Sequence, residues 1–169
     1  LPGNTPGRFP RIEVFELPFV ADVRAAPNAR AVWEFYGRHL REEFREVHPI
    51  TVWAHDGGVV HANREVRRLE DLRSPTFYTT SFILAMNPAR YQGLPAELRG
   101  VLDANSGMVA AEMAARVWDE QGPQVRQMVE RRRENQIIQL DMAEKARWVE
   151  ACRPVVDAWV AGSRERGFD

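Results

Sequence analysis

The chain has 169 residues, of which 44% are hydrophobic and 28% are charged, and its formal net charge is −1. This composition is typical of a globular domain, and the balanced charge excludes the basic footprint that most nucleic-acid-binding proteins carry. A single cysteine, Cys152, excludes an internal disulfide framework and a cysteine zinc cage, and no apolar run approaches the roughly 20 residues of a membrane span.

The N-terminal third predicts a turn segment, an extended segment and a helix. Residues 1–11 are rich in proline and glycine, and residues 12–20 are apolar, with Pro18 favouring an edge or crossover over a central strand. A helix is predicted from Pro27 to about Val47, because apolar side chains recur there at helical spacing while arginine and glutamate occupy the other face.

The middle of the chain predicts strands. Residues 50–54 form a short β-branched strand, a turn follows at 56–58, and residues 59–62 are a second extended stretch. Residues 65–72 are polar and predict a surface turn of helix. Residues 77–86 are the clearest strand, and their continuous apolar end favours burial on both faces. We expect strands 50–54 and 77–86 to be neighbours in one sheet, with the long helices packed around them.

Two helices are predicted next. Pro95 suits the first position of a helix that runs to about Ala104. Asn105 or Ser106 can cap a longer helix, which Gly122-Pro123 should bend or divide.

The C-terminal end predicts a short strand at 136–140 and a final helix. Asp141 with Glu144 forms a capping-box-like start for this helix, and Pro154 should kink it. The methionine and tryptophan stripes of the last helices, with Cys152, read as core. The fold class that follows is α/β, with more helix than strand.

One cluster could hold a metal ion. His48, His55, Asp56 and His61 supply imidazoles and a carboxylate, which bind divalent cations and act as general bases. Their spacing matches no tight signature such as HExxH, so an ordinary turn, contact with a ligand, and a metal site all stay open. A small metal-dependent hydrolase using His55, Asp56 and His61 is therefore one alternative function, and a helical interaction module is another.

A small-anion site is a further hypothesis. Ligands of open α/β folds bind beyond strand ends, and two such ends are flanked by Trp53, His55, Tyr78, Thr79 and Thr80. Such a site combines hydrogen bonds, an aromatic wall and an arginine fork. Arg73 is the arginine best placed in sequence for the fork, although it can equally be a surface residue in a loop.

Taken in order, several segments resemble one family, the solute-binding proteins of TRAP (tripartite ATP-independent periplasmic) transporters. The segments that carry this resemblance are Pro6–Pro10, EVFELPFV at 13–20, Ala54–Gly58 with His61, VRRLEDL at 66–72, SFILAMNPARYQGLP at 81–95, AELRGVLDANSG at 96–107 and WVEACRPVVDAWV at 148–160.

The resemblance implies a periplasmic-binding-protein-like lobe, with a short mixed sheet and long C-terminal helices. It implies capture of a small organic anion, usually a carboxylate, in the periplasm and delivery to membrane permease subunits, by a protein that is not itself membrane-embedded. It implies no catalysed reaction, no cofactor and no metal. The segments that match the family's cleft place ligand contacts at Asn4, Thr5, Phe9, Trp53, His55, Tyr78 and Thr79, with Arg73 as a candidate remnant of the carboxylate clamp.

The chain also departs from the family pattern. The family has a strand, a helix and a strand before the segment that opens here at Leu1, and a clamp-bearing strand and a second lobe after the segment that ends at Leu72. Here Arg73-Ser74-Pro75 follows at once. We therefore expect residues 1–169 to be one incomplete α/β lobe, with an insertion missing near 72–75 and a spatial break between Leu72 and Arg73. A chain without the clamp is expected to bind little ligand, and the lack of a signal peptide carries no weight against a periplasmic location.

Overall fold

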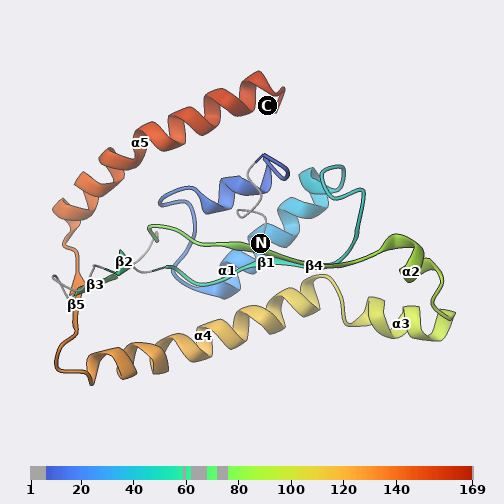
Figure 1. Ribbon diagram of the computed structural model, residues 1–169, viewed down its shortest axis with the longest axis horizontal. Coiled ribbons are helices and arrows are strands. Elements are labelled where there is room, and N and C mark those ends of the chain that lie inside the picture. The colour runs from blue at the N-terminus through green and yellow to red at the C-terminus, as the bar shows by residue number, and fades with distance from the viewer. Residues whose placement is uncertain (1–6, 59, 62–67, 72–75, 169) are drawn as a thin grey trace.

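The structure, a computed structural model, describes residues 7–58, 60–61, 68–71 and 76–168 (Figure 1). The expected break between Leu72 and Arg73 lies outside these residues. So do three of the candidate contacts, Asn4, Thr5 and Arg73.

Strands β1 (His48–Ala54) and β4 (Ser81–Met86) pair antiparallel, from His48 opposite Met86 to Ala54 opposite Ser81. The prediction that these two segments are neighbours in one sheet is confirmed. β4 begins at Ser81 instead of residue 77, and the segment before it bonds to the loop after β1, since Gly58 N donates to Tyr78 O at 2.8 Å. The prediction that this strand is buried on both faces is wrong, because Leu84 is 50% exposed.

The first helix ends earlier than its pattern predicts. Helix α1 (Ala25–Phe35) passes into the π-helical turn η3 (Tyr36–Leu40), and residues 41–46 continue as turns. Its apolar face is nevertheless used as predicted, since Val32, Leu40 and Phe44 are buried against β1.

The predicted extended segment at 12–20 is wrong. Residues Ile12–Glu16 form a 3₁₀ helix, η2, whose Ile12 is fully buried in the core beside Val32 and Phe44. The Glu43 carboxylate accepts a hydrogen bond from Arg11 N at 3.0 Å just before this helix. Tertiary contacts from α1 and its following turns therefore overrule the local strand pattern.

Helices α2 (Pro88–Gln92), α3 (Ala96–Ala104) and α4 (Met108–Glu130) follow β4. Asn105 and Ser106 do not cap α4 as predicted. Their side chains instead donate to carbonyls at the end of α3, with Ser106 Oγ 2.6 Å from Leu102 O. Gly107 begins α4 with φ +67°, a conformation that glycine adopts without strain.

Helix α4 packs on α1 and β1 through small side chains. Ala25 and Ala29 of α1 meet Ala111 and Ala115 of α4, and Trp53 of β1 packs against the same cluster. Small side chains let the two helices approach closely. This packing fixes α4 next to the C-terminal end of β1.

A second small sheet joins distant parts of the chain. Among the described residues, β3 (Arg68–Asp71) lies between β2 (Val60–His61) and β5 (Gln136–Gln139), antiparallel to the first and parallel to the second. The strand predicted at 136–140 is confirmed. The helical turn predicted at 65–72 is wrong for residues 68–71, because pairing with β5 holds them extended.

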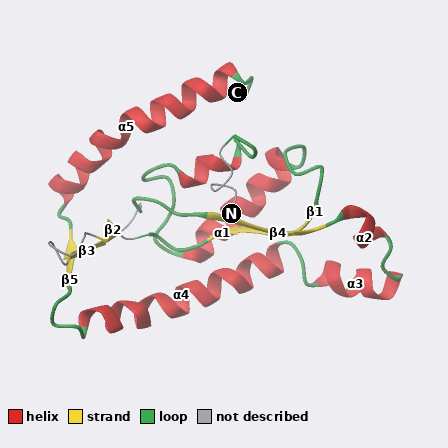
Figure 2. Cartoon of the chain, viewed as in Figure 1, coloured by secondary structure: helices red, strands yellow, loops and turns green. Residues whose placement is uncertain are grey.

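Helix α5 (Met142–Glu165) starts at Asp141, whose side chain accepts from Glu144 N at 2.8 Å as predicted. Figure 1 shows α4 and α5 on opposite sides of the β1–β4 pair. Pro123 and Pro154 lie inside these helices but divide neither of them (Figure 2).

The apolar stripes of α4 and α5 are not simply core. Many of their large side chains are exposed, and Cys152 is half-buried. The exposed members are Val109, Met113, Val117, Trp118, Val125, Met128, Val149 and Val155. In the described part of the chain, no helix is long and apolar enough to cross a bilayer. The architecture is mixed α/β with small sheets and long helices, as expected.

Candidate ligand-binding site

The structure brings four of the predicted site residues together at the end of the β1–β4 pair. Thr79 is 1% exposed, and its hydroxyl donates to His55 O at 2.9 Å. The Tyr78 ring meets the His55 ring edge-on at 6.4 Å, and Trp53 lies two residues earlier on β1. Phe9 is elsewhere, stacked on Phe44 at 4.7 Å in the core.

The backbone at this strand end is held by buried Asn28 of α1. Its amide donates to His55 O at 2.9 Å and to Asp22 O at 2.8 Å, and its oxygen accepts from Asp22 N. Three hydrogen bonds therefore tie α1, the loop before it and the end of β1 into one unit. This unit sets the position of the loop Asp56–Gly57 that follows.

A cavity of about 580 Å³ opens beyond this strand end. One wall is the C-terminal half of α4, whose lining residues run from Trp118 and Asp119 through residues 121–123, Val125 and Arg126 to Val129. The other walls are Val23 and Arg24 before α1, Asp56 and Gly57 after β1, Thr76 before β4, and Ile137 of β5. Its volume and mostly apolar walls match those of a small-molecule site.

None of the predicted ligand contacts that the structure describes is among the residues lining this cavity, whereas Asp56, a candidate of the metal hypothesis, is. Their neighbours line it instead, and Trp118 links the two groups. The Trp118 ring lies 5.2 Å from the His55 ring and 6.2 Å from the Phe82 ring, and Trp118 is 40% exposed. The pattern of α4 predicted a core position for Trp118, so sequence reasoning missed it.

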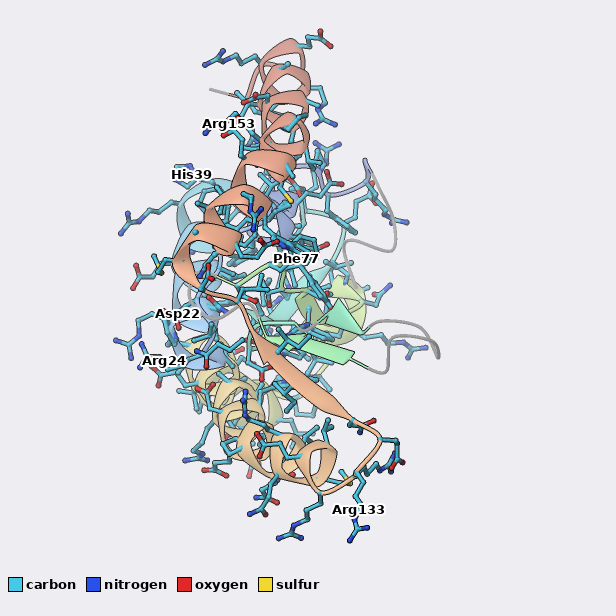
Figure 3. The ribbon with its side chains drawn as sticks, turned by 90° about the vertical axis from the view of Figure 1, so that its left-hand side faces the viewer. Asp22, Arg24, His39, Phe77, Arg133 and Arg153 are labelled. Carbon is cyan, nitrogen blue, oxygen red and sulfur yellow. The ribbon has the colours of Figure 1, made fainter. Side chains whose placement is uncertain are left out.

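Two arginines in the cavity wall were also missed. Arg24 Nε donates to Asp22 Oδ1 at 3.3 Å, and 70% of the Arg24 side chain is exposed (Figure 3). Arg126 Nε donates to Glu130 Oε1 at 3.0 Å. A guanidinium carries five N–H donors in a planar fork that matches the two oxygens of a carboxylate, so both side chains bring a carboxylate-binding group to the cavity wall.

Asp119 of α4 holds the start of α1. Its carboxylate accepts from Ala25 N at 2.7 Å and from Ala26 N at 3.0 Å. These N–H groups begin a helix and have no partner within it, and the helix dipole favours a negative charge there. Asp119 thereby fixes the wall that carries Trp118 to the wall that carries Arg24.

The described residues offer little to a metal ion. In the ranges that the structure covers, no three histidine, cysteine, aspartate or glutamate side chains are grouped so that they could hold one. His55 Nδ1 lies 3.4 Å from Asp56 Oδ1, and the side chain of His61 lies outside what the structure describes. The hydrolase alternative therefore gains no support from these residues.

Comparison with known proteins gives a consistent result. A profile of the family described as bacterial extracellular solute-binding protein, family 7, matches residues 74–162, which is more than half of the chain. Among curated proteins, no relative matches the chain.

Solved structures share the fold over almost the whole chain. A TRAP solute-binding protein from Rhodoferax ferrireducens T118, in complex with copurified benzoate, has a TM-score of 0.89 and 27% identity, over 100% of this chain and 73% of the other. A marine metagenome TRAP solute-binding protein specific for aromatic acid ligands has 0.86 and 20%, over 99% and 73%. One from Bordetella bronchiseptica, with bound (R)- and (S)-mandelate, has 0.80 and 18%, over 97% and 73%.

Proposed function

Since the chain belongs to family 7 of the bacterial extracellular solute-binding proteins, we propose that it captures a small organic acid as its carboxylate and passes it to the permease subunits of a TRAP transporter. Proteins of this family are periplasmic and normally non-enzymatic.

The observation that carries the proposal is the cavity beyond the end of β1, with two arginines in a mostly apolar wall. A guanidinium matches a carboxylate because two parallel N–H donors meet two oxygens, and the apolar wall accepts the rest of a small acid. The Rhodoferax relative, which is 27% identical to the chain over the aligned residues, was solved with a carboxylate, benzoate.

The four predicted residues at the strand end support this site from behind. We propose that His55 and Thr79 hold the loop Asp56–Gly57 in place, through the hydrogen bond from the Thr79 hydroxyl to His55 O. Trp53 packs inward on Phe82 with ring centroids 5.1 Å apart. Tyr78, which is 40% exposed, has the most accessible ring of the three aromatic residues among them.

The test is a thermal-shift screen of organic acids on the wild-type chain and on three variants. An acid present at 100 times its Kd stabilises the native state by about 2.7 kcal/mol. For a chain of this size that is roughly 5 to 10 °C in Tm. Arg24→Gln and Arg126→Gln should each reduce the shift.

Arg116→Gln is the matched control. Arg116 lies on α4, pairs with Glu120 at 4.0 Å, is 70% exposed and is not among the residues lining the cavity. Its variant should respond to acids as the wild type does. No shift with any acid at high excess, or an equal loss in all three variants, would refute the proposal.

A further inference from the structure

The geometry points to Trp118 as the residue that selects aromatic over aliphatic acids, by offering its indole ring as a stacking surface to the ring of an aromatic monocarboxylate. This inference rests on the proposed function, because it assigns a ligand class to the same cavity. It also predicts something that carboxylate binding alone does not, namely a preference between acids of equal charge and similar size.

The first support is the exposure of Trp118 within the cavity wall. Tryptophan is highly buried on average in folded proteins, whereas Trp118 is 40% exposed and lines the cavity. It lies on the face of α4 that also presents Val125 and Arg126. One helix face therefore presents an aromatic ring, an apolar side chain and a guanidinium in succession.

The second support is that the ring is held in place from behind. The ring centroids of His55 and Phe82 lie 5.2 Å and 6.2 Å from that of Trp118, at interplanar angles of 32° and 34°. His55 is itself fixed, because its backbone oxygen accepts from the side chains of Asn28 and Thr79. A ring held in this way loses little conformational freedom when a ligand stacks on it, which favours affinity.

The third support is the charge of the walls, which favours a single carboxylate. The lining carries two guanidinium groups, of Arg24 and Arg126, but it also carries the carboxylates of Asp56 and Asp119. A second carboxylate on the ligand would approach these acidic side chains and be repelled, since like charges in a partly dehydrated site disfavour each other. Most of the remaining wall is apolar and suits a ring.

The test compares benzoate with cyclohexanecarboxylate, two acids with the same charge and similar size, of which only benzoate has an aromatic ring. Isothermal titration on the wild-type chain should give tighter binding of benzoate. The expected preference is about three- to tenfold, because offset aromatic pairs contribute an order of 1 kcal/mol beyond the area they bury. Trp118→Leu should bring this ratio close to one, and Trp118→Phe should keep part of it.

Val117→Leu is the matched control, because Val117 is the neighbouring residue on α4, is 53% exposed and is not among the residues lining the cavity. Its ratio should equal that of the wild type. The inference would be overturned if the wild type bound both acids equally, or if Trp118→Leu kept the wild-type ratio of the two affinities. Neither result would contradict the proposed function. Binding of neither acid would overturn this inference, and failure of the whole acid panel would overturn the proposed function as well.

Discussion

Removing the Asp119 carboxylate should destabilise the protein more than removing an ordinary helix cap. Asp119→Ala deletes both acceptors of the Ala25 and Ala26 N–H groups, which lie more than ninety residues away in sequence. The substitution therefore leaves two donors at the start of α1 without their partner. It also removes one of the contacts that join α1 to α4, whose alanine cluster remains.

The size of the effect follows from the geometry. Loss of an N-cap side chain costs about 1 kcal/mol. Asp119 is half-buried and makes two short bonds, of 2.7 Å and 3.0 Å, and charged acceptors contribute about twice as much as neutral ones. We therefore expect Asp119→Ala to lower the free energy of unfolding by about 2 kcal/mol, which is roughly 4 to 8 °C in Tm for a chain of this length.

Urea denaturation followed by circular dichroism measures this loss, with Asp141→Ala as the matched control. Asp141 caps α5 through one bond to Glu144 N, within its own helix and at an exposed position. Its removal should cost about 1 kcal/mol or less. If the two variants lost equal stability, the claim that Asp119 joins two separate walls of the cavity would be refuted.

Two further predictions concern other parts of the fold. Gly58→Ala should lower the free energy of unfolding by about 1 to 3 kcal/mol, because the new Cβ would overlap the Tyr78 ring. Gly100→Ala in α3 meets nothing within 4 Å and should raise the free energy of unfolding by about 0.5 to 1 kcal/mol. The same urea titration measures both variants, and an undiminished stability of Gly58→Ala would contradict the close packing of Gly58 against Tyr78. Burial raises the pKa of Glu43 above its ordinary value of 4.5, so on acidification the native state takes up this proton before the unfolded state does. The stability of the wild type relative to Glu43→Gln should therefore rise as the pH falls from 7 through that raised pKa towards 4.5, and a constant difference across this range would contradict it.

Local patterns predicted those elements whose signals lie within a few residues. Asp141 caps α5 as its spacing with Glu144 indicates, and the β-branched run of β1 pairs with β4. The failures occurred where distant contacts decide. Residues 68–71 are polar enough to suggest a helical turn but pair with β5, more than sixty residues later, and Ile12–Glu16 leaves its extended pattern to bury Ile12 against α1.

The candidate site shows the same division between local and distant information. A strand end can be read from the sequence, so Trp53, His55, Tyr78 and Thr79 were placed together correctly. Which residues line the cavity depends on where α4 crosses that strand end, and the crossing is set by alanine packing against α1.

Trp118 illustrates why the position of α4 at this strand end could not be predicted from the sequence. Its apolar stripe on α4 is the pattern of a helix buried along one side, yet α1 and β1 cover only the alanine positions of that helix and leave the Trp118 ring partly exposed in the cavity. An apolar residue on a helix stripe can face either a core or a ligand, because both require the same side-chain chemistry. The two can be told apart by what covers the stripe, and that information comes from the packing of other elements and not from the stripe itself.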